Sequence, residues 1–310
     1  MSYTSPRFLI VIAGPTAVGK TDLTIQLAKH FATHIISADS RQMFRELKIG
    51  TAAPLPEQLA EVPHHLVGNL SINDYYNIAM FEYDVIQQLD ELFQTHNCVI
   101  LSGGSGLYID TVLNGVDDMP VVDHDIRDSL NLEFQQFGIE PLRKKLEELD
   151  PITYNLIDLQ NPKRIIKALE VSIQTGKPYS SFLTGEKKER PFHAIRICLN
   201  RPRPELYQRI DTRVIQMVEQ GLEAEVRQWN NHRELNALNT VGYKEWFPYF
   251  DGEYDYDEVV RLIQRNTRRY AKRQLTWWGR DKRWSYFHPD DMNEILEFVK
   301  KEMDYLNKLE

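Results

Sequence analysis

Apolar residues in this 310-residue chain gather in short runs, separated by longer stretches of mixed polarity. Four runs have the length and composition of buried strands, at residues 8–13, 34–37, 98–102 and 194–199. Most of the segments between them repeat their apolar residues at helical spacing, as residues 21–31 do. Because strands alternating with helices are typical of a parallel sheet, we predict an α/β core.

The stretch from 121 to 191 differs from its surroundings. It is polar and helical in pattern, and prolines at 141, 151, 162 and 178 divide it into pieces. It falls between the third and fourth predicted strands, so we expect a helical insertion at the ligand-binding edge of the sheet. The predicted division is a catalytic core of residues 1–120 and 192–310 and a helical insertion domain of residues 121–191.

The first apolar run leads into the most specific motif of the chain. The pattern G-x-x-x-x-G-K-[ST] is met at every fixed position by Gly14, Pro15, Thr16, Ala17, Val18, Gly19, Lys20 and Thr21. In such a loop, backbone N–H groups point inward and the following helix directs its positive end at an anion. Lys20 would neutralise terminal phosphates, and the Thr21 hydroxyl would reach Mg²⁺. We therefore predict a P-loop NTPase-like core that binds a phosphate or diphosphate.

An acid follows the second predicted strand but not the third. Asp39 comes directly after Ala38, whereas the third strand ends in the glycine-rich run 102–106. Nucleoside triphosphatases usually place an Asp at the end of such a strand to help hold Mg²⁺. Beside a diphosphate, Asp39 can act as a general base, bind Mg²⁺ through water, or simply shape a turn. Its position alone leaves these three roles open.

Charge is distributed unevenly along the chain, whose net charge is −8. Residues 1–120 carry 6 basic against 13 acidic side chains, whereas residues 191–284 carry 17 against 13. Within the second region, residues 261–284 hold nine basic side chains and one acid, with Tyr270 and three tryptophans among them. This pattern suits a polyanion whose bases stack on aromatic rings. A solvated helix face produces the same pattern.

The cysteines and the lengths of the apolar runs indicate the cellular compartment that we expect for the protein. Cys98 and Cys198 lie in apolar runs without metal or redox spacing, which predicts buried thiols in a reducing compartment. The longest apolar runs are strand-sized, and the sequence shows no export leader. We expect a cytoplasmic protein with no membrane partner.

Eight blocks in chain order carry a resemblance to a known family. They lie at residues 14–21, 39–42, 49–52, 63–66, 103–108, 161–170, 241–245 and 267–274. Over nearly its whole length the chain resembles the tRNA dimethylallyltransferases, also called tRNA isopentenyltransferases. The resemblance implies transfer of a dimethylallyl group from dimethylallyl diphosphate to the exocyclic amine of adenosine 37, immediately 3′ of the anticodon. The implied acceptors are tRNAs that read codons beginning with U, and the by-product is diphosphate.

The resemblance also implies a role for each matching position. Asp39 would be the general base, Lys20 and Thr21 would assist catalysis, and Thr21 would hold the cofactor Mg²⁺. Arg268 would join the phosphate loop in binding diphosphate, and the helical insertion would grip the anticodon stem. The implied tRNA contacts are Asp39, Ser40, Arg41, Gln42, Ser105, Arg127, Gln160, Asn161, Pro162, Lys163, Arg164, Asn239, Thr240, Val241, Gly242, Tyr243 and Lys244. The implied partners are a tRNA anticodon stem-loop and dimethylallyl diphosphate, and we expect a monomer.

Two other classes of protein are weighed against this one. An ATP-dependent P-loop kinase of small molecules would share the loop, but it would call for an acid after the third strand. A non-catalytic RNA-binding module would leave both the loop and Asp39 without a purpose. Some of the implied tRNA contacts also have a purely structural explanation. Arg164 can be a surface arginine, and Tyr243 with Lys244 can cap a helix.

Overall fold

A parallel sheet forms the centre of the computed structural model, which describes residues 6–121 and 123–308. Within these residues the six strands are β1 (Phe8–Ala13), β2 (Ile35–Ser37), β3 (His64–His65), β4 (Cys98–Gly103), β5 (His193–Leu199) and β6 (Ser285–Phe287). They are ordered β3-β2-β4-β1-β5-β6, and every neighbouring pair is parallel. The α/β prediction and the four predicted strands are confirmed. The predicted domain ranges also include residues 1–5, 122 and 309–310, which lie outside the described residues.

The chain divides into two compact units, each described by itself. One comprises the residues up to Asn114 and from Glu189 onward, and the other is Gly115–Lys188. The segments near Asp117 and Thr184, which connect the second unit to the first, contact each other and belong to the second unit. There Thr184 N donates to Asp117 Oδ1 (2.9 Å), and Lys188 forms an ion pair with Asp118 (2.9 Å).

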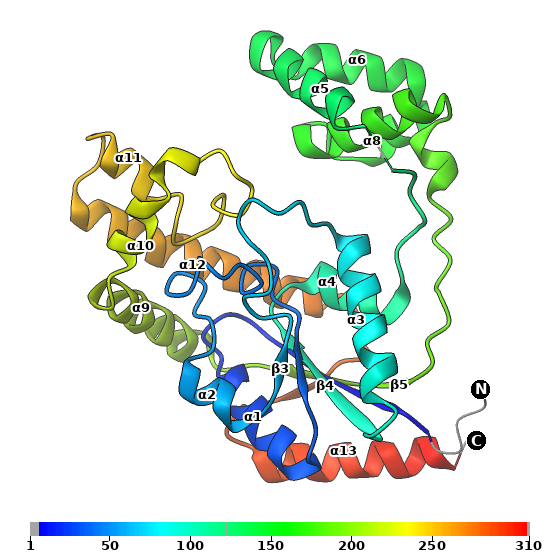
Figure 1. The fold of residues 1–310 in the computed structure, drawn as a ribbon, viewed down its shortest axis with the longest axis vertical. Helices are drawn as coiled ribbons and strands as arrows, with labels where there is room; N and C mark the ends of the chain where they lie inside the picture. Colours follow the sequence, from blue (N-terminus) through cyan, green and yellow to red (C-terminus); the bar gives the residue numbers. More distant parts are fainter. Residues whose placement is uncertain (1–5, 122, 309–310) are drawn as a thin grey trace. The chain divides into compact units, whose positions relative to one another are not determined.

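The first unit has helices that cover the sheet and helices that lie to one side of it (Figure 1). They are α1 (Lys20–Phe31), α2 (Pro56–Glu61), α3 (Ile78–Leu92), α4 (Gly106–Asn114), α9 (Arg203–Glu219), α10 (Leu222–Gln228), the 3₁₀ turn η2 (Asn230–His232), α11 (Trp246–Phe250), α12 (Tyr256–Trp278) and α13 (Met292–Asn307). The helices to one side, α10 and α11, pack in a separate core with parts of α9 and α12. No helix in the described part of the chain combines the length and the apolar character needed to cross a bilayer.

The second unit is helical. Its elements are α5 (His124–Phe137), α6 (Glu140–Leu149), α7 (Pro151–Leu156), α8 (Pro162–Thr175) and the 3₁₀ turn η1 (Tyr179–Phe182). Its own core gathers Leu130, Leu142, Leu146 and Leu169, which are almost fully buried. Four helices with a separate apolar core are a compact module within one chain.

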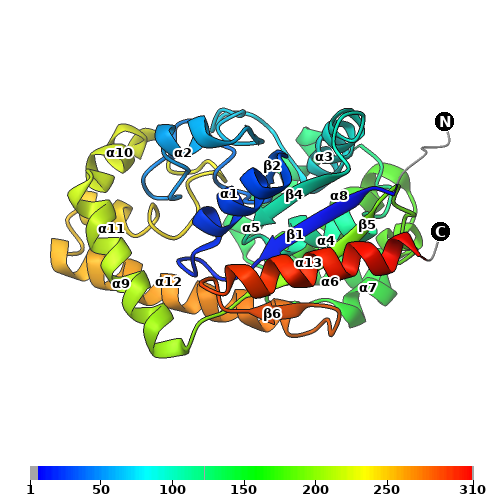
Figure 2. The same cartoon turned by 90° about the horizontal axis from the view of Figure 1, so that it is seen from below.

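Alternate residues of β1 are buried on opposite faces of the sheet, as the two-residue period of a strand requires. Ile10 and Ile12 face a core completed by α1, α9 and α13, while Leu9 and Val11 face a core completed by α3, α4 and Trp278 of α12. Figure 2 shows α1 and α13 crossing the same side of the strands. Covered on both faces, β1 must be apolar throughout, and this is why its sequence predicted a strand so clearly.

Two strand ends approach each other closely at the carboxyl edge of the sheet. A Cβ placed on Gly103, at the end of β4, would lie 2.1 Å from the carbonyl oxygen of Ala38, which follows β2. Only glycine leaves room for this contact. It sets the spacing between Asp39 and the turn after β4.

Replacing Gly103 with Ala should therefore force these strand ends apart and lower the free energy of unfolding by roughly 2–3 kcal/mol. Urea denaturation followed by circular dichroism measures the change. Gly279→Ala is the matched control, because a Cβ there meets its nearest atom at an ordinary 3.4 Å. Equal stability of the two variants would contradict the close approach.

Candidate active site

The loop between β1 and α1 adopts a backbone that its sequence makes possible. Gly14 and Gly19 have φ values of 151° and 111°, and Ala17 also has a positive φ of 64°. A Cβ on Gly14 would lie 2.8 Å from the carbonyl oxygen of Leu199, at the end of β5. The loop thus turns tightly at the carboxyl end of a central strand, where parallel α/β sheets bind their ligands.

Lys20 folds back over this loop. Its Nζ donates to the carbonyl oxygens of Gly14 and Pro15, both at 2.9 Å. Burial lowers the pKa of Lys20 to about 8, with the nearby charge of Arg213 acting in the same direction and Asp39 opposing it. The charges of Arg213 and Asp39 therefore both act on the Lys20 ammonium group, and an anionic ligand would favour its charged form.

The start of α1 adds a partial positive charge to the same place. A helix leaves the N–H groups of its first turn without intrahelical partners, and its dipole favours an anion there. Lys20 and Thr21 occupy the first two positions of this 12-residue helix. The geometry is that of an anion site.

Mg²⁺ is implied by the loop motif, and the oxygen donors present fit it. Thr21 offers a hydroxyl at the start of α1. Across the described residues, no group of three or more His, Cys, Asp or Glu side chains is arranged to hold a metal. Mg²⁺ is commonly bound by one or two protein oxygens, with phosphate and water completing its shell. The donor set fits an ion that is held jointly with a diphosphate.

Two arginines hold the outer side of the loop. Arg201 Nε donates to the carbonyl oxygen of Val18 (2.8 Å), and Arg209 Nε donates to that of Ala17 (2.9 Å). Holding these carbonyls outward helps keep the adjacent N–H groups turned to the anion side. Neither arginine was predicted from the sequence. The only available signal was that Arg201 comes just after the fourth predicted strand, at the ligand edge of the sheet.

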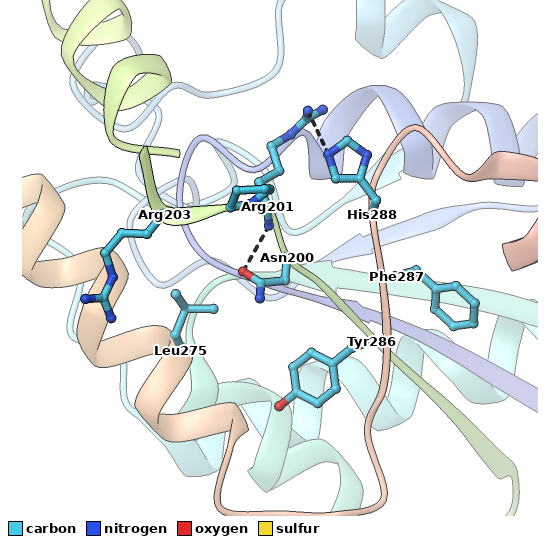
Figure 3. A pocket seen from close by; sticks show the side chains of 8 residues that line it. Asn200, Arg201, Arg203, Leu275, Tyr286, Phe287 and His288 are labelled. Carbon is cyan, nitrogen blue, oxygen red and sulfur yellow. Dashed lines mark hydrogen bonds between the residues drawn. The ribbon is translucent and has the colours of Figure 1, made fainter. Parts of the chain in front are cut away.

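A hollow of about 430 Å³ lies next to Arg201, beyond the ends of β5 and β6. Figure 3 shows the Arg201 guanidinium directed toward His288, 3.2 Å from its Nε2. Arg201 also forms an ion pair with Asp290 (2.8 Å). This hollow contains none of the predicted site residues, so we place the candidate site at the phosphate loop and Asp39.

Asp39 lies at the end of β2, as the sequence predicted. Its Oδ1 accepts the backbone N–H groups of Arg41 (2.9 Å) and Gln42 (3.4 Å), which fixes the carboxylate in a turn. The hydroxyl of Tyr270 is nearby: burial, then the charge of Asp39, raise the pKa of this tyrosine to about 12. Near neutral pH Tyr270 therefore stays protonated, so its hydroxyl is able to donate a hydrogen bond.

The turn after β4 contacts the same region. Ser105 Oγ accepts the backbone N–H of Ser40 (3.0 Å) and lies 3.2 Å from the Ser40 hydroxyl. Asp39 and Ser105, which are 66 positions apart, are thereby held on neighbouring strand ends. The structure brings together the phosphate loop, residues 39–42 and Ser105.

Residues 239–244 follow Asn236, which contacts Arg41 of the candidate site. Arg41 Nη1 donates to the carbonyl oxygen of Asn236 at 2.8 Å. Asn239 and Lys244 are exposed, but Tyr243 is fully buried.

The buried Tyr243 hydroxyl donates to Glu225 (2.5 Å), whose carboxylate also accepts the N–H of Gly50 (3.1 Å). A Cβ on Gly50 would clash with the tyrosine ring. In this structure Tyr243 is fully buried and shapes the loop. Binding of tRNA at this position stays a prediction.

Arg268, the predicted diphosphate ligand, is paired with Asp211 of α9. The arginine whose charge acts on both Lys20 and Asp39 is Arg213, two residues further along α9. Arg213 could not be predicted, because nothing in its local sequence pattern separates it from a solvated helix residue. For Arg268, diphosphate binding stays a prediction.

The remaining predicted residues belong to the second unit. Arg127 makes two hydrogen bonds of 2.6 Å to Glu170, whose side chain is fully buried. The block 160–164 forms the start of α8, with Asn161 as its N-cap and Pro162 as its first residue. Lys163 and Arg164 are exposed in the first turn, which contains no acidic residue. This end of α8 is therefore positively charged.

The fold and the site define an α/β protein of the phosphate-loop class. Its carboxylate at the edge of the sheet, Asp39, follows β2 and not β4. Comparison with known proteins makes the class specific. The sequence profile described as IPP transferase matches residues 42–281. The chain belongs to the IPP transferase family, as the eight blocks predicted, and the kinase alternative is not favoured.

Relatives match nearly the full chain. The tRNA dimethylallyltransferase 1 of Bacteroides fragilis is 51% identical over 293 residues, covering 94% of this chain and 97% of the relative. The tRNA dimethylallyltransferase of Cytophaga hutchinsonii is 51% identical over 297 residues, covering 96% and 98%.

Solved structures agree with this fold. The full-length tRNA isopentenylpyrophosphate transferase of Bacillus halodurans superimposes with a TM-score of 0.72 at 33% identity, covering 98% of this chain and 99% of its own. A eukaryotic dimethylallyltransferase acting on tRNA gives a TM-score of 0.73 at 25% identity, covering 87% and 69%.

Binding of inorganic pyrophosphate should weaken as pH rises through about 8, the value to which burial lowers the pKa of Lys20. Above it the free protein loses the ammonium charge, so the affinity should fall by close to tenfold per pH unit. Calorimetric titration between pH 7 and 9.5 measures this. Lys20→Met is the control, because pyrophosphate's own ionisation affects both proteins. Parallel profiles would rule out Lys20 as the titrating group.

Proposed function

We propose that this protein transfers a dimethylallyl group from dimethylallyl diphosphate to the exocyclic amine of adenosine 37 in tRNAs that read codons beginning with U. One observation carries the proposal: Lys20 is hydrogen-bonded to the phosphate loop through the carbonyl oxygens of Gly14 and Pro15, and the Asp39 carboxylate lies near enough to act on its charge. No acid ends β4, where an NTPase would bind Mg²⁺. The site thus has one half that binds an anion and another half, Asp39, that can accept a proton.

The anion-binding half receives the diphosphate of the donor. Lys20, the start of α1 and the charge of Arg213 favour the leaving group as negative charge builds on it. Mg²⁺ bound at Thr21 would neutralise further charge on the diphosphate. We keep Arg268 as an additional diphosphate ligand, which it can become by exchanging Asp211 for phosphate oxygens.

Asp39 performs the acid–base step. The exocyclic amine of adenine is a poor nucleophile, since its lone pair is shared with the ring. As the new N–C bond forms and the allylic C–O bond breaks, Asp39 takes one proton from the amine and diphosphate leaves with the bonding electrons. The reacting adenine cannot reach Asp39 from within a stacked anticodon loop, so it must be flipped out.

The RNA is held by segments from both units. Residues 39–42, Ser105 and the exposed side chains of 239–244 surround the flipped base. The start of α8, with Lys163 and Arg164 in its first turn, suits a phosphate of the anticodon stem. In this proposal the helical unit grips the stem. All reacting groups come from one chain, so we propose that the monomer is active.

One assay separates the candidate functions. Protein, Mg²⁺ and labelled dimethylallyl diphosphate are incubated with an anticodon stem-loop that contains A37, and with a matched stem-loop that contains G37. Label should enter only the A37 RNA. Absence of label together with ATP hydrolysis would instead favour the kinase.

Asp39→Asn should lower the single-turnover rate by about 10²-fold or more, the usual contribution of a general base, while RNA affinity changes little. Asn keeps the oxygen that accepts the N–H of Arg41, so the turn should survive. Rapid-quench measurements with saturating substrates give the rate, and filter binding gives the affinity. Asp255→Asn, at the exposed N-cap of α12, is the control. A near-normal rate in Asp39→Asn would remove Asp39 as the base.

Arg164→Gln should raise the KM for tRNA several-fold and reduce the salt dependence of binding by about one counterion. The KM for dimethylallyl diphosphate should not change. Lys177→Gln, an exposed change just beyond the other end of α8, provides the comparison. If both variants bind tRNA like the unchanged protein, the start of α8 does not contact the stem.

A further inference from the structure

Gln274 of α12 joins two parts of the candidate site that lie far apart in sequence. Its Oε1 accepts the backbone N–H of Thr16 in the phosphate loop (2.9 Å). Its Nε2 donates to the carbonyl oxygen of Gly104 in the turn after β4 (2.9 Å). Gln274 is only 6% exposed, so both hydrogen bonds are shielded from water.

The contact with Thr16 acts on the same peptide group that Lys20 holds. In the peptide between Pro15 and Thr16, the carbonyl oxygen accepts from Lys20 and the N–H donates to Gln274. Because a peptide group is planar, fixing both ends fixes the orientation of the whole group. The loop is therefore held at this point by two side chains from different elements.

The contact with Gly104 connects Gln274 to the segment that contains Asp39, the proposed general base. Gly104 precedes Ser105, whose Oγ accepts the N–H of Ser40, the residue after Asp39. A continuous series of hydrogen bonds and covalent bonds thus runs from Thr16 through Gln274 to Asp39. The Gln274 side chain of α12 thus joins the loop after β1 and the turn after β4 directly.

We propose that Gln274 is a positioning residue that sets the distance and orientation of the phosphate loop relative to Asp39. This inference rests on the proposed function, in which the loop holds the leaving diphosphate and Asp39 removes the proton. Transfer requires the amine, the allylic carbon and the leaving oxygen to be aligned, and a misplacement of about 1 Å can cost about 10²-fold in rate. A side chain that fixes both halves supplies that alignment.

Glutamine suits this task because its amide carries one acceptor and one donor side by side. The site is also built around it. A Cβ on Gly104 would lie 2.4 Å from Gln274 Nε2, so any larger residue at position 104 would displace the amide. We call the two hydrogen bonds of Gln274, to Thr16 and to Gly104, the clamp. The clamp can be broken by changing either Gln274 or Gly104.

The test compares Gln274→Met, Gly104→Ala and the double variant. Each single change should lower the single-turnover rate at saturating substrates by about tenfold or more, while the KM for tRNA stays within about threefold and that for dimethylallyl diphosphate rises by no more than about fivefold. Because both changes release one clamp, the double variant should be no slower than the slower single variant. Rates are expressed per folded protein, judged by circular dichroism at the assay temperature.

Gln264→Met is the matched control. Gln264 lies on the same helix and donates to a backbone carbonyl, that of Asp211, but it does not contact the loop. It should retain the rate of the unchanged protein. The inference is overturned if Gln274→Met keeps its full rate, if its loss equals its unfolded fraction, or if the two losses are additive.

A second measurement separates this inference from the proposed function. Titration with inorganic pyrophosphate needs no prenyl transfer, and Gln274→Met should bind it about fivefold more weakly, the effect of one hydrogen bond of about 1 kcal/mol. If the unchanged protein transfers no dimethylallyl group but this difference in affinity is found, the proposed function falls and the clamp on the loop stands. Equal affinities would overturn the clamp whatever the reaction is.

Discussion

Burial of the Lys20 ammonium group is the constraint from which the arrangement of the site follows. A cation taken out of water must find oxygen partners, and the carbonyls of Gly14 and Pro15 supply them. Turning those carbonyls toward Lys20 determines the path of the loop, and Arg209 and Arg201 hold the carbonyls of the next turn. Asp39 then offsets part of the cost of burying the charge.

The sheet and the two halves of the site could be predicted from the sequence because each rests on a local pattern. The strands β1, β2, β4 and β5 are apolar runs, the loop is a motif of eight residues, and Asp39 follows a strand. The strands β3 (His64–His65) and β6 (Ser285–Phe287) are short and contain no run of aliphatic residues, so their sequences do not stand out as strands.

The side chains that fix the loop could not be predicted. Arg201, Arg209 and Gln274 reach it from 183 to 258 positions away, and tertiary packing alone brings them there. Tyr243 and Arg127 show the reverse difficulty. Both were expected to touch RNA, yet Tyr243 is buried against Glu225 and Arg127 is bound to Glu170. A motif marks where a residue matters without saying whether it touches a ligand or builds the surface that does.

Insertion of the helical unit between α4 and β5 has a consequence for how the chain is assembled. Phe8 of β1 pairs with His193 of β5, so this central ladder closes only after about 185 further residues have been made. Until then β1 has an exposed edge and two apolar faces, a state prone to aggregate. The helical unit, with its own core, is complete before the sheet. Synthesis rate and chaperone access during that interval are therefore expected to govern the yield of folded protein.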